Sequence, residues 1–320
     1  MMTRVISHGK VILSGEHAVV YGCPACALAV NKRVQGEYTL RTDGIIRLIC
    51  RELGIEESMT RDDVMRVYHD VVERYNAFQS NNLPILQVLQ SPLNLCWATI
   101  ASLLKKMSPD MGCDIHLTTT IPVGCGMGSS AAVIVNLLLG INELFNLTLS
   151  DDRIFILALE AENWQHGYSS GLDIHLALRG GVQVFQKNQR PVFLKINALP
   201  FDYVNSGAPE SSTGECVAFV REQCFSNLLW QEFEKTTLAV ICALKSGNQH
   251  SLLKMIKKNH RLLCQIGVVP SAIQAMIADI EEAGGAAKIC GAGSIRGNAA
   301  GMILIIPPIG KKIDDSSPSR

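Results

Sequence analysis

The chain has 320 residues, with 29 basic and 29 acidic side chains and a formal net charge of zero at pH 7. The balanced charge argues against a broad surface for nucleic acid or for an anionic membrane. No uninterrupted apolar run reaches the roughly 20 residues of a membrane span, and the N-terminus shows no apolar signal region. A hydrophobic content of 48% and this length predict a compact protein of two domains in the cytoplasm.

Cysteine usage favours a reducing compartment. The eleven cysteines are scattered, and several of them, such as Cys96, Cys242 and Cys264, lie in apolar segments. This is the usage of reduced thiols rather than of a disulfide scaffold. Cys23 and Cys26 form a C-x-x-C pattern. Because no second pair and no thioredoxin-like context accompany it, a redox or metal role at this pair is disfavoured.

The first hundred residues alternate between strand and helix patterns. Residues 4–7 predict a short strand, and a second apolar strand begins at Lys10 and ends before Glu16 and His17. An isolated Glu-His pair is most often a solvated turn; its alternative is a pair of polar side chains presented at a loop. One or two strands are predicted over 25–41, and helices over 61–78 and 91–106, with Trp97 and Leu103 in the core of the second.

The most informative stretch is a glycine-rich loop between a strand and a helix. Residues 113–121 alternate and are rich in β-branched side chains, which indicates a strand, and 131–144 form an apolar helix pattern. The loop between them has glycine at 124, 126 and 128, followed by Ser129 and Ser130. Such a loop can turn its N–H groups inward at a helix start and hold an anion, which predicts a site for nucleotide phosphates. The alternative is a tight turn without a ligand.

Two acidic residues follow at the next helix and turn. Ser150 predicts the cap of a helix that runs to about residue 164 and carries Glu162. A turn of small residues then ends in Asp173. As a bare pattern, both acids could be surface charges. Strands over 182–185 and 192–196 would end the first domain, which predicts domains 1–195 and 196–320.

The second domain is predicted to be mainly helical. A strand and helix cap over 201–213 precede three helix patterns at 227–245, 250–264 and 271–283. Residues 287–294 predict a strand running into a glycine turn, and 300–306 predict the next strand. Residues 311–320 are expected to form a frayed polar tail.

The glycine loop resembles a family signature. It matches neither the Walker A lysine pattern nor the dinucleotide pattern G-x-G-x-x-G in a Rossmann unit. The sequence Pro122-Val-Gly-Cys-Gly-Met-Gly-Ser-Ser-Ala131 is similar to the P-x-G-x-G-L-G-S-S-A motif of the GHMP kinases, with Met127 in the place of leucine. Leucine and methionine have similar volumes, so this replacement is conservative.

Other segments resemble the mevalonate kinase branch of this family. Residues 9–22 are similar to its opening P-G-K-V-I-L-x-G-E-H-A-V-V-x-G, although Ser7-His8 replaces Ala-Pro. The family's H-G-x-P-S-G-x-D-N corresponds to residues 166–174, with Ser169 in place of Pro and Ile174 in place of Asn. Its K-x-T/S-G-A-G-G-G-G corresponds to the segment from Lys288, where residues 294–298 are bulkier and carry one cation.

The resemblance implies an α+β fold of two domains, with an N-terminal domain like ribosomal protein S5 domain 2 and a ferredoxin-like C-terminal domain. It further implies ATP-dependent phosphorylation of the 5-hydroxyl of mevalonate to 5-phosphomevalonate. Mevalonate and ATP are then the expected small-molecule partners, with neither nucleic acid nor membrane. The sequence leaves a monomer and a homodimer both open.

The resemblance also assigns roles to residues. Asp173 would accept the proton of the attacking hydroxyl, with Lys10 nearby stabilising the transferring group. Ser130 and Glu162 would ligate Mg²⁺. Glu16, His17, Gly291 and Ala292 would contact substrate, a protonated or hydrogen-bond-donating histidine being suited to an anion with two hydroxyls. The expected ATP-binding residues are Pro122, Gly124, Cys125, Gly126, Met127, Gly128, Ser129, Ser130 and Ala131.

Two alternatives stay open at this point. One is another GHMP kinase that acts on phosphomevalonate, homoserine or a sugar; homoserine kinases fit less well because they lack an acid at the position of Asp173. The other is a catalytically weak relative that binds a nucleotide or an isoprenoid precursor. Only Ile174 and the altered segment 294–298 support this second alternative.

Overall fold

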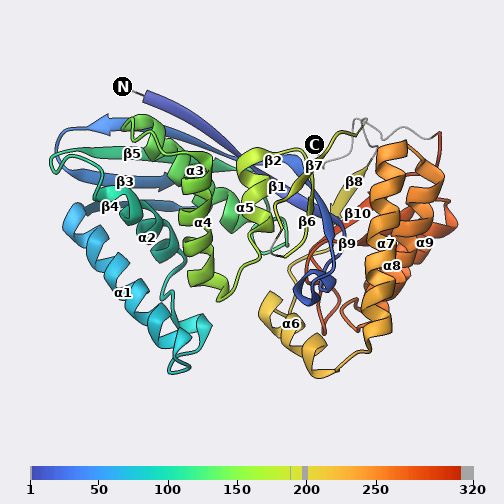
Figure 1. Ribbon diagram of the computed structural model, residues 1–320. Helices are drawn as coiled ribbons and strands as arrows, with labels where there is room; N and C mark the ends of the chain where they lie inside the picture. The colour runs from blue at the N-terminus through green and yellow to red at the C-terminus, as the bar shows by residue number, and fades with distance from the viewer. Residues whose placement is uncertain (1, 188, 197–200, 311–320) are drawn as a thin grey trace. The chain divides into compact units, whose positions relative to one another are not determined.

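A computed structural model describes residues 2–187, 189–196 and 201–310 (Figure 1). The chain divides into two compact units that are each discontinuous in sequence. The first unit comprises residues 1–9, 32–121 and 128–179, and the second comprises 10–31, 122–127 and 180–320. Residues 197–200, beside the predicted domain boundary, and the predicted polar tail at 311–320 lie outside the described residues. The boundary near residue 195 stays a prediction.

The sheet of the first unit has the strand order β4-β3-β5-β2. The long β2 runs antiparallel to β5, with Val34 opposite Thr119 and Arg41 opposite Gly112, while β3 and β5 are parallel. One continuous β1 replaces the two short strands expected at the N-terminus, and it pairs with β2. The strands are β1 (Met2–Ser14), β2 (Ala25–Arg41), β3 (Ile45–Cys50), β4 (Ile55–Thr60) and β5 (Gly112–Thr119).

Helices of the first unit pack on one another beside this sheet (Figure 1). Trp97 and Leu103 are fully buried in α2, as predicted. Ser91 and Ser150 accept hydrogen bonds from backbone N–H groups at the starts of α2 and α4, which satisfies donors that have no partner within the helix. The helices are α1 (Arg61–Gln79), α2 (Pro92–Leu104), α3 (Ser129–Leu144), α4 (Asp151–His166) and α5 (Leu172–Arg179), with short 3-10 turns at Arg51–Leu53 and Ile85–Gln87.

A buried polar contact fixes α3 against the sheet. The Tyr38 hydroxyl donates to both the carbonyl and the side-chain oxygen of Asn136, each at 2.8 Å. The Asn136 amide nitrogen donates to the Val34 carbonyl at 3.1 Å. Both side chains are fully buried, so these hydrogen bonds replace those that water would supply. Gly140 makes room for the Tyr38 ring, because a Cβ atom there would lie 2.1 Å from it.

The second unit holds a three-stranded antiparallel sheet of order β8-β10-β9, together with β6, β7 and the beginning of β2. Its core contains the apolar side chains of Trp230, Phe233, Leu263 and Ile303. Ser212 caps α6 in a reciprocal capping box with Glu215. The elements are β6 (Val182–Phe185), β7 (Val192–Leu194), β8 (Asp202–Asn205), β9 (Ala286–Ile289), β10 (Met302–Ile306), α6 (Thr213–Glu222), α7 (Asn227–Ser246), α8 (Gln249–Gln265), α9 (Ser271–Glu282) and a 3-10 turn at Ala18–Tyr21.

The predicted α+β class is confirmed, and so are the three long helices of the second unit. Among the described residues, no helix has the length and apolar character needed to cross a membrane. The described cysteines are unpaired, and Cys23 and Cys26 are both buried.

The close contact at Gly140 predicts that Gly140→Ala destabilises the protein. Alanine is favoured over glycine in a helix by about 1 kcal/mol, but overpacking a filled core costs about 1–3 kcal/mol. We expect the clash with the buried Tyr38 ring to dominate and the apparent melting temperature to fall. Gly214→Ala in α6 is the matched control, because the nearest atom to its Cβ would be 4.0 Å away. A Gly140→Ala protein that melts at or above the wild-type temperature would contradict this packing argument.

Candidate active site

The apolar side chains of the glycine loop are buried in the protein, while part of its backbone is exposed to solvent. In the second unit, Cys125 and Met127 are buried, whereas Gly124 and Gly126 are exposed. Both glycines have positive φ angles, 73° and 78°, which side chains rarely allow. The buried Met127 explains why a leucine-sized side chain is needed there. The loop therefore presents backbone groups while its apolar residues anchor it.

Contacts with strands of the second unit fix this loop. The Lys10 N–H donates to the Met127 carbonyl at 2.9 Å, and the Met302 N–H donates to the Cys125 carbonyl at 3.2 Å. At Gly126 a Cβ atom would lie 2.7 Å from the Cys290 carbonyl oxygen, so only glycine fits without a shift. The loop rests on the first strand and on the segments that join β9 to β10.

The start of α3 belongs to the first unit. Gly128 precedes the helix in a left-handed conformation, and no side chain caps the first turn. The first N–H groups of a helix have no partner within it, and the helix dipole adds positive potential there. Ser129 and Ser130 are half-buried and Ala131 is fully buried. An uncapped start on a helix of 16 residues suits an anion such as phosphate.

Lys10, Glu16 and His17 come from β1 and the turn after it, and all three are buried. Burial raises the pKa of Glu16 above its ordinary value, while the Lys288 ammonium works in the opposite direction. His17 has a positive φ angle of 58°, which is rare outside glycine. Its Nε2 lies 2.9 Å from the Ala292 carbonyl oxygen, which ties the predicted substrate residues 17 and 292 to each other.

Burial favours the neutral form of the His17 ring. Burial lowers the pKa of His17, although the hydrogen bond to Ala292 opposes this effect. A neutral ring that faces a carbonyl through Nε2 carries its proton there, so Nδ1 is an acceptor. That Nδ1 is buried without a hydrogen-bond partner. Burial therefore favours a neutral His17 whose free ring atom is a hydrogen-bond acceptor, and the role of His17 toward substrate stays a prediction.

In the first unit, Glu162 and Asp173 lie on α4 and at the start of α5. Glu162 is 3% exposed, and its Oε2 accepts from the Ser169 hydroxyl at 2.5 Å. Ser169, which stands in the place of the family's proline, also accepts from the Gly171 N–H at 3.1 Å. Asp173 is half-buried, and Ile174 is fully buried in the core. Ile174 therefore fills the interior instead of taking over the polar role of an asparagine.

The chemistry of Ser130 and Glu162 fits a magnesium ion. Mg²⁺ prefers oxygen ligands and is usually held by one or two carboxylates, with waters and substrate phosphates in the other positions. Across the described part of the chain, no group of three or more His, Cys, Asp or Glu side chains could hold a metal. A hydroxyl and one buried carboxylate are the donor set expected when phosphates complete the coordination.

The bulkier segment 294–298 is held by the start of α6. The Ser294 hydroxyl accepts from the Ser211 N–H at 3.2 Å and donates to the Arg296 carbonyl at 2.7 Å. The Arg296 guanidinium pairs with Glu215 at 2.6 Å. The Ser212 N–H and this guanidinium lower the pKa of Glu215 to about 2. The cation predicted in this loop is therefore engaged in a local ion pair.

One side chain of this site was not recognised as functional from the sequence. Lys288 is fully buried in β9, and its ammonium group pairs with Glu16. The sequence feature that indicates this buried ion pair is a single lysine within the otherwise apolar strand sequence Ala-Ala-Lys-Ile at 286–289. A charged residue in such a strand requires a buried partner.

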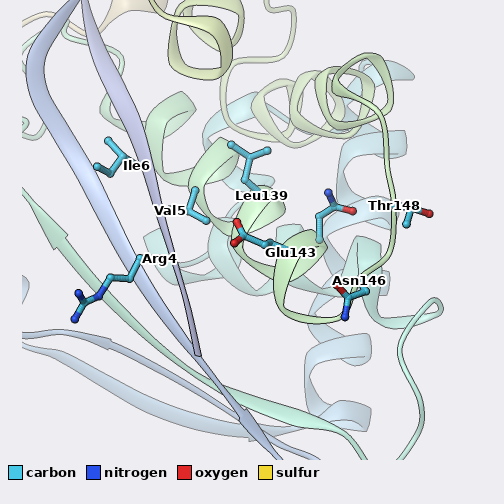
Figure 2. A pocket seen from close by; sticks show the side chains of 8 residues that line it. Arg4, Val5, Ile6, Leu139, Glu143, Asn146 and Thr148 are labelled. Atoms are coloured by element: carbon cyan, nitrogen blue, oxygen red, sulfur yellow. The ribbon is translucent and has the colours of Figure 1, made fainter. Parts of the chain in front are cut away.

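A separate pocket of about 510 Å³ lies in the first unit (Figure 2). Its charged groups are engaged locally: Arg4 pairs with Glu37 at 2.8 Å, and Glu143 accepts from the Thr3 hydroxyl. Figure 2 shows Arg4 extending away from Glu143. None of the predicted site residues lines this pocket. Its lining comprises Arg4, Val5, Ile6, Leu139, Asn142, Glu143, Asn146 and Thr148.

Comparisons with known proteins agree with these features. Residues 94–181 match the family model of the GHMP kinases N terminal domain. The chain is 30% identical over 288 residues to a mevalonate kinase of Archaeoglobus fulgidus, which covers 89% of this chain and 87% of the relative. It is 28% identical over 298 residues to a mevalonate kinase of Thermococcus sibiricus, covering 89% and 84% of the two chains.

A solved structure supports the fold. The crystal structure of the Methanococcus jannaschii mevalonate kinase superposes with a TM-score of 0.78 at 23% identity, covering 96% of this chain and 91% of that one. At this identity the likeness speaks for the fold alone, whereas the Archaeoglobus relative extends it to the sequence. The chain belongs to the mevalonate kinase family within the GHMP kinases.

Proposed function

We propose that this protein transfers the γ-phosphoryl group of ATP to the 5-hydroxyl of mevalonate, giving 5-phosphomevalonate and ADP in the cytoplasm. The observation that carries the proposal is the 30% sequence identity to the Archaeoglobus mevalonate kinase, in an alignment that covers 89% of this chain. The glycine loop, the Glu16-His17 turn and the two acids of the first unit support it as the residues this reaction needs.

Phosphoryl transfer requires positioning and charge stabilisation more than covalent chemistry. The loop from Pro122 to Ala131 would bind the phosphates through its backbone N–H groups. Asp173 would accept the proton of the substrate hydroxyl, and Lys10 would stabilise the charge on the transferred group. Ser130 and Glu162 would hold Mg²⁺, which when bound neutralises phosphate charge.

The turn at residues 16–17 would select the alcohol. The unpaired Nδ1 of neutral His17 and the unpaired Oε2 of Glu16 are both acceptors, so they suit the hydroxyl groups of mevalonate. Gly291 and Ala292 would contribute backbone contacts beside them. A site built to hydrogen-bond a substrate group discriminates strongly against compounds that lack it.

The alcohol specificity is tested by steady-state kinetics with a coupled ADP assay. Mevalonate, phosphomevalonate, homoserine and galactose are each supplied with ATP and Mg²⁺. We expect mevalonate to give the highest kcat/KM. A higher kcat/KM for another alcohol would replace the proposed substrate, and no turnover with any of them would favour a binding protein.

The proton-acceptor role predicts a large effect of Asp173→Asn. This change keeps the size of the side chain and removes its basicity, so turnover should fall by about 10²–10⁴, as is typical when a general base is lost. Asp62→Asn is the control, because Asp62 also lies in the first turn of a helix but is exposed. Near-normal turnover of the Asp173→Asn enzyme would exclude the assignment.

The proposed metal ligand predicts a changed dependence on magnesium. Glu162→Gln retains an oxygen acceptor for Ser169 but removes the negative charge, so the Mg²⁺ concentration for half-maximal rate should rise about tenfold or more. Glu160→Gln, at an exposed position of the same helix, serves as the control. If the two variants show the same Mg²⁺ titration as wild type, Glu162 does not bind the ion.

A further inference from the structure

Lys288 has an environment that uses all of its hydrogen-bonding capacity. Its ammonium group donates to the Ile12 carbonyl at 3.0 Å, to the Ile289 carbonyl at 2.7 Å and to the Glu16 carboxylate. An ammonium group has three N–H donors and no acceptor, so three partners satisfy it. The side chain is completely buried. Lys288 therefore has no donor left for a substrate, although its partner Glu16 has one unpaired oxygen.

Two of the three acceptors belong to the proposed substrate turn and to the strand that leads into it, and the third is the carbonyl of the neighbouring residue Ile289. Ile12 belongs to the last part of β1, and Glu16 lies in the turn that follows. A second buried contact holds the same strand end, because the Ser14 and Thr237 hydroxyls are 2.7 Å apart. Lys288 thus holds the turn through the Glu16 carboxylate, and it holds the preceding strand through the Ile12 carbonyl.

The turn needs such support because its backbone is strained. A residue other than glycine at positive φ is strained and persists only where its surroundings impose that conformation. His17 adopts such an angle directly after Glu16. Its ring reaches the Ala292 carbonyl, four residues beyond Lys288. The Lys288–Glu16 ion pair therefore joins the turn at residues 16–17 to the β9 segment. The distance between these two segments determines how the His17 ring is oriented.

We propose that Lys288 is a positioning residue, which acts through Glu16 to hold the Glu16-His17 turn for the substrate and does not itself bind substrate. This inference rests on the proposed function of that turn. Stability alone gives a poor account of the pair, because buried ion pairs can often be replaced by apolar residues at no cost in stability. Replacing only one member of the pair lowers stability, because it leaves the other charge buried without a partner.

A double-mutant cycle between Lys288→Met and Glu16→Gln tests this inference. Removal of Lys288 should lower kcat/KM for mevalonate on the order of 10–100-fold through misplacement of the turn, with the KM for ATP nearly unchanged. If Lys288 acts through Glu16, the double variant should lie within about threefold of the more impaired single variant, because coupled residues are not additive. Melting curves of all variants are recorded alongside.

Two outcomes would overturn the inference. A double variant whose loss equals the product of the two single losses would show that Lys288 acts independently of Glu16. A Lys288→Met enzyme with wild-type kinetics for mevalonate would show that the pair positions nothing. Lys258→Met is the matched control, since Lys258 pairs with Glu232 at 2.6 Å but both side chains are 40% exposed. Exposed ion pairs hold little of the structure in place, so the kinetics of this variant should be unchanged.

The test remains decisive if Lys288→Met fails to fold. The double variant carries neither charge of the Lys288–Glu16 pair and is then compared with Glu16→Gln alone. Equal mevalonate kinetics within about threefold support the inference, and a further loss of about tenfold overturns it. Wild-type turnover of mevalonate is measured first. Its absence would reject the proposed function, whereas additive losses in an active enzyme would reject only the role of Lys288.

Discussion

The ammonium group of Lys288 is a buried charge whose hydrogen bonds determine the arrangement of the chain around it. A buried cation is tolerated only when it is paired and hydrogen-bonded. Its partners Ile12, Glu16 and Ile289 therefore have to converge on one point. Since Glu16 precedes His17 directly, the position of that ring follows from the same requirement. The hydrogen bond between His17 and Ala292 joins the turn to the segment that follows the strand carrying Lys288.

The glycine loop depends on the same region of the second unit. Its Gly126 lies against the Cys290 carbonyl, two residues after Lys288, and Cys125 accepts from the N–H of Met302 in β10. A side chain at position 126 would collide with backbone, which cannot move without shifting β9. The requirement for glycine is thus set by contact with another segment as well as by the positive φ angle. The loop contacts Cys290 and the turn contacts Ala292, so two parts of the proposed site that lie far apart in sequence both meet the segment after β9.

Local signals made much of the fold predictable. Strand β2 and helix α3 follow from alternation and apolar periodicity, and Ser150 and Ser212 mark helix starts because their side chains satisfy free N–H groups. Partners distant in sequence could not be predicted. The pairing of Lys288 with Glu16 joins residues 272 positions apart, and no local pattern specifies it. For the same reason the sequence indicated which residues form the Glu-His turn but not the neutral state of its histidine.

Three departures from the family pattern, at residues 169, 294 and 296, have acquired partners in the fold. Ser169 lacks the rigidity of proline, yet its hydroxyl joins Glu162 to the turn before α5. Ser294 replaces a glycine, and its hydroxyl is hydrogen-bonded to the start of α6. Arg296 is neutralised by Glu215, so it adds no free cation to the loop. In a comparison of sequences alone, each of these three replacements is a mismatch to the family motif. In the structure, each side chain has a hydrogen-bond or ion-pair partner. The replacements at 169, 294 and 296 are thus accommodated by the fold, whereas Ile174 lies in the core and supplies no polar group. The sequence identity to mevalonate kinases is what argues against a catalytically weak relative.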